Sequence, residues 1–147
     1  MAQSTEKSSE YRTPTMMMWL EPPDLVCVRG YGDAATEDVR ETTKRINDLI
    51  RGWPYVLVMV DQSQQASMSS DARRAATETP PGAPYRGTVF YGGSLVMRTV
   101  GQLVMRLINA LRKTDNPAVF FRTEAEARAW IDQRRREIAS PAVEKSA

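Results

Sequence analysis

Alternating strand-like and helix-like stretches predict an α/β fold for this chain of 147 residues. Two observations lead to this class. Short apolar runs and amphipathic stretches follow one another in the order β-β-α-β-α-β-α-β-α. The run at residues 55–60 is apolar throughout, which is typical of a strand buried on both faces. We therefore expect a mixed, largely parallel five-stranded sheet with about four helices and right-handed crossovers.

A hairpin is expected at the start of the folded region. The apolar runs at residues 16–20 and 25–30 are typical of strands, and Glu21-Pro22-Pro23-Asp24 between them has the composition of a turn. The first of these strands is expected to form an antiparallel edge of the sheet.

Three helix-strand units and a last helix are expected after the hairpin. In order, they are a helix at 34–51, a strand at 55–60, a short helix at about 70–78, a strand at 87–91, a helix at 95–113, a strand at 118–121 and a last helix to about 138. Asp33 or Thr36 is the expected cap of the first helix, and Gly52 suits its left-handed end. Thr123 and Glu126 form the pattern of a capping box at the last helix.

The termini are polar and are expected to be disordered tails, at residues 1–14 and 139–147. Residues 15–138 then form a single domain, which is long enough to bury a core without disulfides. No apolar run is long enough to span a membrane, and the N-terminus has no apolar signal core. The expected compartment is the cytoplasm.

The composition excludes several classes of function. Twenty Lys+Arg against eighteen Asp+Glu give a net charge of +2, which argues against a dedicated nucleic-acid binder. The absence of histidine removes the usual catalytic triads and histidine zinc sites, and Cys27 is the single cysteine. We expect no metal, no cofactor and no catalytic residue, so a binding module is favoured over an enzyme.

Three motifs carry a resemblance to a known family. They are VMVDQSQQASMSSDARRA, a buried strand ending in Asp before a Ser-rich loop; RGTVFYGGSLVMRTVGQLVMRLINAL, a strand, a Gly-Gly-Ser turn and a long helix; and VFFRTEAEARAWI, a strand and a capped helix. Their order and spacing resemble the STAS domain of bacterial anti-sigma-factor antagonists, and most closely its sporulation-antagonist-like offshoot. That offshoot is also compared with CRAL-TRIO lipid-binding proteins.

The loop after residue 60 resembles the antagonists' phosphorylation motif only in part. The family pattern is D-x-S-x-x-x-x-x-D-S-S-G, of which Asp61, Ser63 and Ser70 match their positions. Ser69 stands where the second Asp would be, and Asp71 stands at the second serine. The departure argues against a phosphoserine switch here. Capping of the short helix by Ser69 or Ser70 is the favoured interpretation over a phosphorylation site.

Loops that leave parallel strands gather at one edge of a sheet, where ligands usually bind. Asp61, Ser63, Ser69, Ser70 and Asp71 belong to this expected edge. The turn Gly92-Gly93-Ser94 lies there too, either as a small anion nest or, as we favour, as a tight turn capped by Ser94.

The helix at 95–113 has an apolar arc that covers nearly half of its circumference, with a polar, basic stripe beside it that includes Arg98 and Arg106. Packing against a neighbouring helix is the ordinary explanation of the extra apolar width. An apolar ligand, an anionic membrane surface or a second copy of the chain in a homodimer are the alternatives.

The leading interpretation is a non-enzymatic, STAS-like regulatory domain that binds a protein partner through the strand-to-helix edge and the basic helix. The alternative, which the CRAL-TRIO comparison implies, is a module that binds an apolar ligand or lipid at a membrane surface. An enzyme would have to work with Asp61 and serines alone, and ranks below both.

Overall fold

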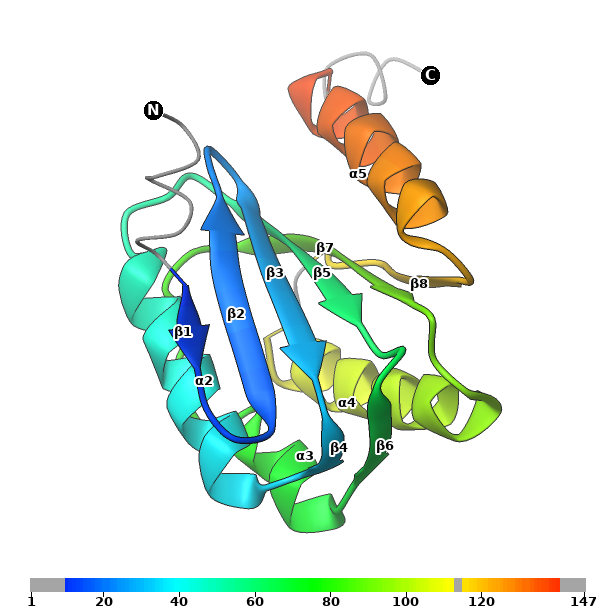
Figure 1. Cartoon of the computed structure of the whole chain (residues 1–147). Coiled ribbons are helices and arrows are strands. Elements are labelled where there is room, and N and C mark those ends of the chain that lie inside the picture. Colours follow the sequence, from blue (N-terminus) through cyan, green and yellow to red (C-terminus); the bar gives the residue numbers. More distant parts are fainter. Residues whose placement is uncertain (1–9, 113–114, 141–147) are drawn as a thin grey trace.

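The computed structural model describes residues 10–112 and 115–140 (Figure 1). The strands are β1 (Tyr11–Arg12), β2 (Met16–Glu21), β3 (Leu25–Gly30), β4 (Gly32–Ala34), β5 (Val56–Asp61), β6 (Gln65–Met68), β7 (Tyr85–Tyr91) and β8 (Ala118–Phe121). The helices are α2 (Thr36–Leu49), α3 (Ser70–Ala75), α4 (Leu95–Arg112) and α5 (Glu124–Ala139).

The main sheet has six strands in the order β1-β2-β3-β5-β7-β8, one more than the sequence predicts. β3, β5, β7 and β8 are mutually parallel, and the hairpin of β2 and β3 is antiparallel, both as expected. The extra strand is β1, which pairs with β2, so β2 is not the edge strand that we expected. Two residues are too few to show a strand pattern in the sequence.

β1 falls within the tail expected at residues 1–14, so part of that segment belongs to the sheet. Residues 1–9 and 141–147 lie outside the described part of the chain, and their expected disorder stays a prediction.

A second correction concerns the polar loop expected at residues 61–70. Residues 65–68 of it form β6, which pairs in parallel with β4 in a separate two-stranded sheet. Ser67 Oγ donates to Asp33 Oδ1 at 2.7 Å across this pair. Asp33 is therefore not the cap of α2: the cap position is Ala35, which has no side chain to bond the helix, and Thr36 is already helical. The alternation in QASM is too short and too polar to indicate a strand.

The other expected helix ends are confirmed. Gly52 has a φ of +92°, in the left-handed region, just beyond α2. Thr123 Oγ1 accepts from the amide of Glu126, whose own carboxylate accepts from the Thr123 amide, which completes the capping box of α5.

Helices cover both faces of the sheet, as the apolar run of β5 predicts. Figure 1 shows α2, α3 and α4 along one face and α5 against the other. Val56 and Val58 belong to the core cluster under α2 and α3, whereas Leu57 and Met59 belong to the cluster under α5. All four side chains are buried. The side chains of β5 point alternately to the two faces of the sheet, so this strand contributes to two separate cores.

Arginine-carboxylate pairs attach α5 to the hairpin. Both Nη atoms of Arg128 donate to the carboxylate of Glu21, at 2.9 and 3.0 Å. Arg135 makes a similar two-pronged contact with the buried carboxylate of Asp24 at 2.8 and 3.0 Å. Hydrogen bonding from Arg128 outweighs the cost of burial and lowers the pKa of Glu21 to about 2. Arg135 in the basic run at 134–136 therefore already has a carboxylate partner within the fold.

Replacing either Leu57 or Val58 with Asp should unfold the domain, because each change buries an unpaired charge in a different core. We expect each to lower the free energy of unfolding by about 3 kcal/mol or more. Thermal melts measure this, with Leu103→Asp on the exposed side of α4 as the control that melts like wild type. A soluble Leu57→Asp or Val58→Asp protein that melts within a few degrees of wild type would contradict the two-sided sheet.

The pair of Glu21 and Arg128 should make stability depend on pH. The pKa of Glu21 falls from an ordinary 4.5 to about 2 on folding, so its contribution is complete above pH 4.5 and disappears as the pH drops toward 2. Glu21→Gln should melt below wild type at neutral pH, and the gap should close over that acid range. A gap that stays constant down to pH 2 would show that the charge of Glu21 does not contribute.

Candidate functional site

Helix α4 is fastened to the rest of the fold near both ends. At its start, Ser94 Oγ accepts from the amide of Met97 at 3.2 Å, and the Nε2 of Gln62 donates to the Met97 carbonyl at 3.0 Å. At its far end, the Nδ2 of Asn109 donates to the carbonyl of Asn116 at 3.1 Å. Between these points, the described residues show no side-chain hydrogen bond from α4 to another element of the fold.

The middle of α4 rests on a pair of stacked aromatic rings. Phe90 of β7 and Phe120 of β8 lie parallel, with 4.6 Å between ring centroids and 8° between ring planes. Gly101 sits directly over them: a Cβ at that position would lie 2.9 Å from Phe120 and 3.3 Å from Phe90. The rings therefore support the helix over β7 and β8 at the edge of the sheet.

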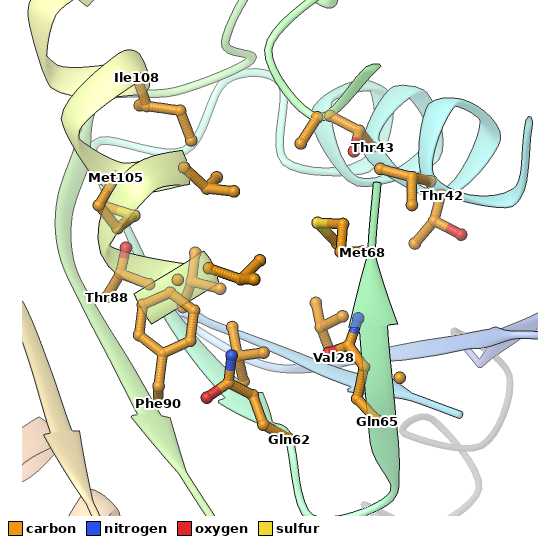
Figure 2. Close-up of a pocket in the computed structure, with 18 of the residues that line it drawn as sticks. Val28, Thr42, Thr43, Gln62, Gln65, Met68, Thr88, Phe90, Met105 and Ile108 are labelled. Atoms are coloured by element: carbon orange, nitrogen blue, oxygen red, sulfur yellow. The ribbon is translucent and has the colours of Figure 1, made fainter. Parts of the chain in front are cut away.

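A cavity of about 150 Å³ lies beside this support, between α4, α2 and the sheet (Figure 2). The sheet side includes Met16, Val28, Val58, Val60, Thr88 and Phe90; α2 contributes Val39, Thr42, Thr43 and Ile46; α4 contributes Met97, Val100, Gly101, Val104, Met105 and Ile108; Gln62, Gln65, Met68 and Ala76 complete much of the remainder. The wall is thus dominated by aliphatic, thioether and aromatic groups.

The polar atoms of this wall are few and poorly matched. None of the described residues that line the cavity carries a formal charge. Four of them have a buried polar atom without a hydrogen-bond partner: Thr42 Oγ1, Gln62 Oε1, Gln65 Nε2 and Asn116 Nδ2. A buried polar atom without a partner costs free energy, so each of these atoms is able to bond to a water or to a ligand in the cavity.

Asp61, the first of the expected site residues, is held on the opposite side of the sheet. Its carboxylate accepts from Arg29 Nε at 2.8 Å, from the Ser63 amide at 2.8 Å and from Ser63 Oγ at 2.6 Å. Burial opposes its ionisation, but the bonds from Ser63 and Arg29 outweigh burial and lower the pKa of Asp61. Burial is the main cause that raises the pKa of Tyr91 to about 12, and the negative charge of Asp61 is the next. Asp61 therefore accepts three hydrogen bonds within the fold, and its expected role at a binding edge stays a prediction.

The expected turn at residues 92–94 lies beside the end of β5. Gly92 has a φ of +77°, and a Cβ there would lie 2.9 Å from the Cβ of Ser63. Gly93 approaches Gln62 in the same way, and Ser94 caps α4. Arg98 lines a shallow open hollow next to Gly93, and Arg106 is exposed further along α4.

Ser69, Ser70 and Asp71 lie apart from this turn. β6 carries the chain away from the end of β5 to α3, which packs on α2, and β6 stands between α3 and the start of α4 in Figure 1. Ser69 caps α3 by accepting from the amide of Ala72 at 3.2 Å, while Ser70 and Asp71 are exposed in its first turn. The expected site residues therefore form two groups.

Sequence reasoning did not find Gln62 and Gln65, the two amides at the lower end of the cavity in Figure 2. Gln62 follows the buried strand β5 directly and is itself only 3% exposed. The polar sequence QSQQ looks the same whether its first residue is buried or belongs to a solvated loop. The excess apolar width of the helix at 95–113 was the one sequence signal of a cavity.

No described helix is long and apolar enough to cross a membrane. No protein-family model and no curated protein matches the sequence. Solved structures do match: a protein from Shewanella loihica PV-4, described as an uncharacterized protein of the DUF3478 family with a SpoIIAA-like fold, has a TM-score of 0.56 at 14% identity, over 82% of this chain and 96% of that one. The unphosphorylated anti-sigma factor antagonist SpoIIAA has a TM-score of 0.48 at 17% identity, over 80% of this chain and 97% of that one. The chain has the STAS-like fold that its sequence motifs predict.

Proposed function

We propose that this STAS-like chain is a non-enzymatic, cytoplasmic regulatory domain that binds a small apolar ligand beneath α4. The observation that carries the proposal is the cavity of about 150 Å³, whose wall is mainly aliphatic and aromatic. The pocket is partly open to solvent and its wall is predominantly apolar, which is the usual character of a binding site for a small molecule. Of the two interpretations left open by the sequence, the cavity favours the apolar ligand.

The size of the cavity limits the ligand. An apolar void of about 150 Å³ accepts a molecule of roughly the size of benzene. The groups that could close on such a ligand come from α4, whose inner side presents Met97, Val100, Val104, Met105 and Ile108. Methionine side chains adapt to the shape of a ligand more readily than branched ones do. A longer acyl chain would enter only if the middle of α4 moved away from the sheet.

A regulatory output requires a surface that α4 can present to something else. Its outer side exposes a row of leucines at helical spacing: Leu95 (76% exposed), Leu103, Leu107 and Leu111 (64% exposed). Arg98 and Arg106 lie in the adjacent row, and both are exposed without an ion-pair partner among the described residues. A ligand beneath α4 and a partner on its outer side would therefore both contact this helix.

This outer row supports a second candidate function, the docking of an acidic protein partner or an anionic membrane surface. Both would cover the leucines and offer negative charge to Arg98 and Arg106. Arg135, in the basic run at 134–136, already contacts a carboxylate within the fold. The basic surface that supports this second function is therefore the one on α4.

Filling the cavity should abolish ligand binding without unfolding the protein. Val104 lies half-buried on the cavity wall, and Val104→Phe places a ring inside. We expect saturating toluene to raise the Tm of wild type by a few degrees, and to leave the Tm of the variant unchanged. Leu103→Phe, one residue along and exposed, is the matched control that keeps the toluene response. A Val104→Phe protein that still responds would place the binding elsewhere.

Vesicles distinguish a membrane from a protein partner. At low salt, wild type should co-sediment with anionic vesicles, and the double variant Arg98→Gln/Arg106→Gln should bind about 30-fold more weakly, at about 1 kcal/mol for each lost charge. Arg51→Gln/Arg136→Gln removes two exposed charges elsewhere and serves as the control. Failure of wild type to sediment with the vesicles would contradict membrane docking and leave the protein partner.

A further inference from the structure

We propose that the ligand of the α4 cavity is an uncharged molecule with a hydroxyl or carboxamide group, whose oxygen accepts a hydrogen bond from Gln65. This inference rests on the proposed function and names the chemical class of its ligand.

The charge of the ligand follows from the wall of the cavity. No described lining residue is an acid or a base, so a carboxylate, phosphate or ammonium group inside would be buried without a counter-charge. An unpaired buried charge is far more costly than an unpaired neutral polar group. A molecule that must bring a carboxylate or phosphate group into this space is therefore disfavoured as a ligand.

The polar group of the ligand follows from Gln65. Its Nε2 is buried without a hydrogen-bond partner among the described residues, and Gln65 lines the cavity, so this atom is a free donor. Its backbone amide donates to the carbonyl of Gln62 at 3.2 Å, which holds the residue close to the end of β5. The Gln62 amide is placed differently: its Nε2 donates to the Met97 carbonyl, and its Oε1 lies against Gly93. The oxygen of a hydroxyl or a carboxamide can accept from Gln65 Nε2.

Both glutamine side chains lie where glycines leave room for them. A Cβ at Gly93 would come within 2.4 Å of Gln62 Oε1, and a Cβ at Gly30 would come within 2.7 Å of the amide carbon of Gln65. Figure 2 shows the two side chains at the same end of the space between α4 and β6. The Gln65 donor is thus held in place by the backbone at Gly30 before any ligand binds.

Three probes of one shape test the class of ligand: benzamide, benzoate and isopropylbenzene, which share a phenyl ring and differ in its substituent. Calorimetric titration at pH 7 should show benzamide binding at least roughly 100-fold more tightly than benzoate, because the carboxylate would be buried unpaired. Gln65→Leu should weaken benzamide binding roughly tenfold, since it removes a hydrogen bond, and should not weaken isopropylbenzene binding.

Two further variants locate the polar group. Gln62→Leu should leave benzamide affinity close to that of wild type, because Gln62 Oε1 lies against Gly93. Isopropylbenzene binding checks that α4 remains in place after the bond to Met97 is lost. Thr42→Val removes another unpartnered buried polar atom of the same cavity, and should leave benzamide affinity within roughly twofold of wild type.

The results separate the two proposals. If isopropylbenzene binds but benzamide does not, or if Gln65→Leu leaves benzamide binding intact, the neutral polar ligand is wrong and the apolar cavity stands. Benzoate binding as tightly as benzamide would likewise overturn the class of ligand. If none of the three probes binds, the proposed function fails and this inference falls with it.

Discussion

The contact of Gly101 with the stacked rings of Phe90 and Phe120 is the constraint on which the candidate site depends. The rings, 4.6 Å apart, fill the space under the helix at the β7–β8 edge, and the absence of a side chain at Gly101 allows the helix to rest directly on them. The helix is then held over two strands at one edge, and the neighbouring area over β3 and β5, where Val28, Val58 and Val60 lie, borders the cavity. A cavity results from an otherwise ordinary α/β packing.

The two faces of the sheet have different roles because their helices are attached differently. α5 is joined to the hairpin by the arginine pairs to Glu21 and Asp24, and it covers a closed core that includes Leu57 and Met59. α4 has neutral hydrogen bonds near its ends and a cavity beside its middle. Neutral hydrogen bonds contribute less than charge-assisted ones, so α4 is the element of this fold best suited to move.

Much of the fold could be predicted from the sequence, because hydrophobic periodicity fixes which elements are helices and which strands are buried twice. The apolar run of β5, the hairpin and the capping box at Thr123 are local patterns, and the structure confirms them. β1 was missed because two residues are too few to show a pattern, and β6 was missed because it is short, polar and held by pairing with the distant strand β4. The site was harder to predict. Asp61 and Ser69 resemble a family motif, and both have hydrogen-bond partners within the fold. Gln62 and Gln65 become cavity residues through the path of the chain after β5.

A crystal structure of the protein under xenon pressure would show whether the cavity beneath α4 exists, because xenon enters apolar cavities and is visible as a strong scatterer. We predict a xenon atom between α4 and the sheet, in contact with Val58 and Val104, with Gly101 packed on the Phe90–Phe120 pair. A structure in which α4 packs directly on β5, with no xenon between them, would contradict it.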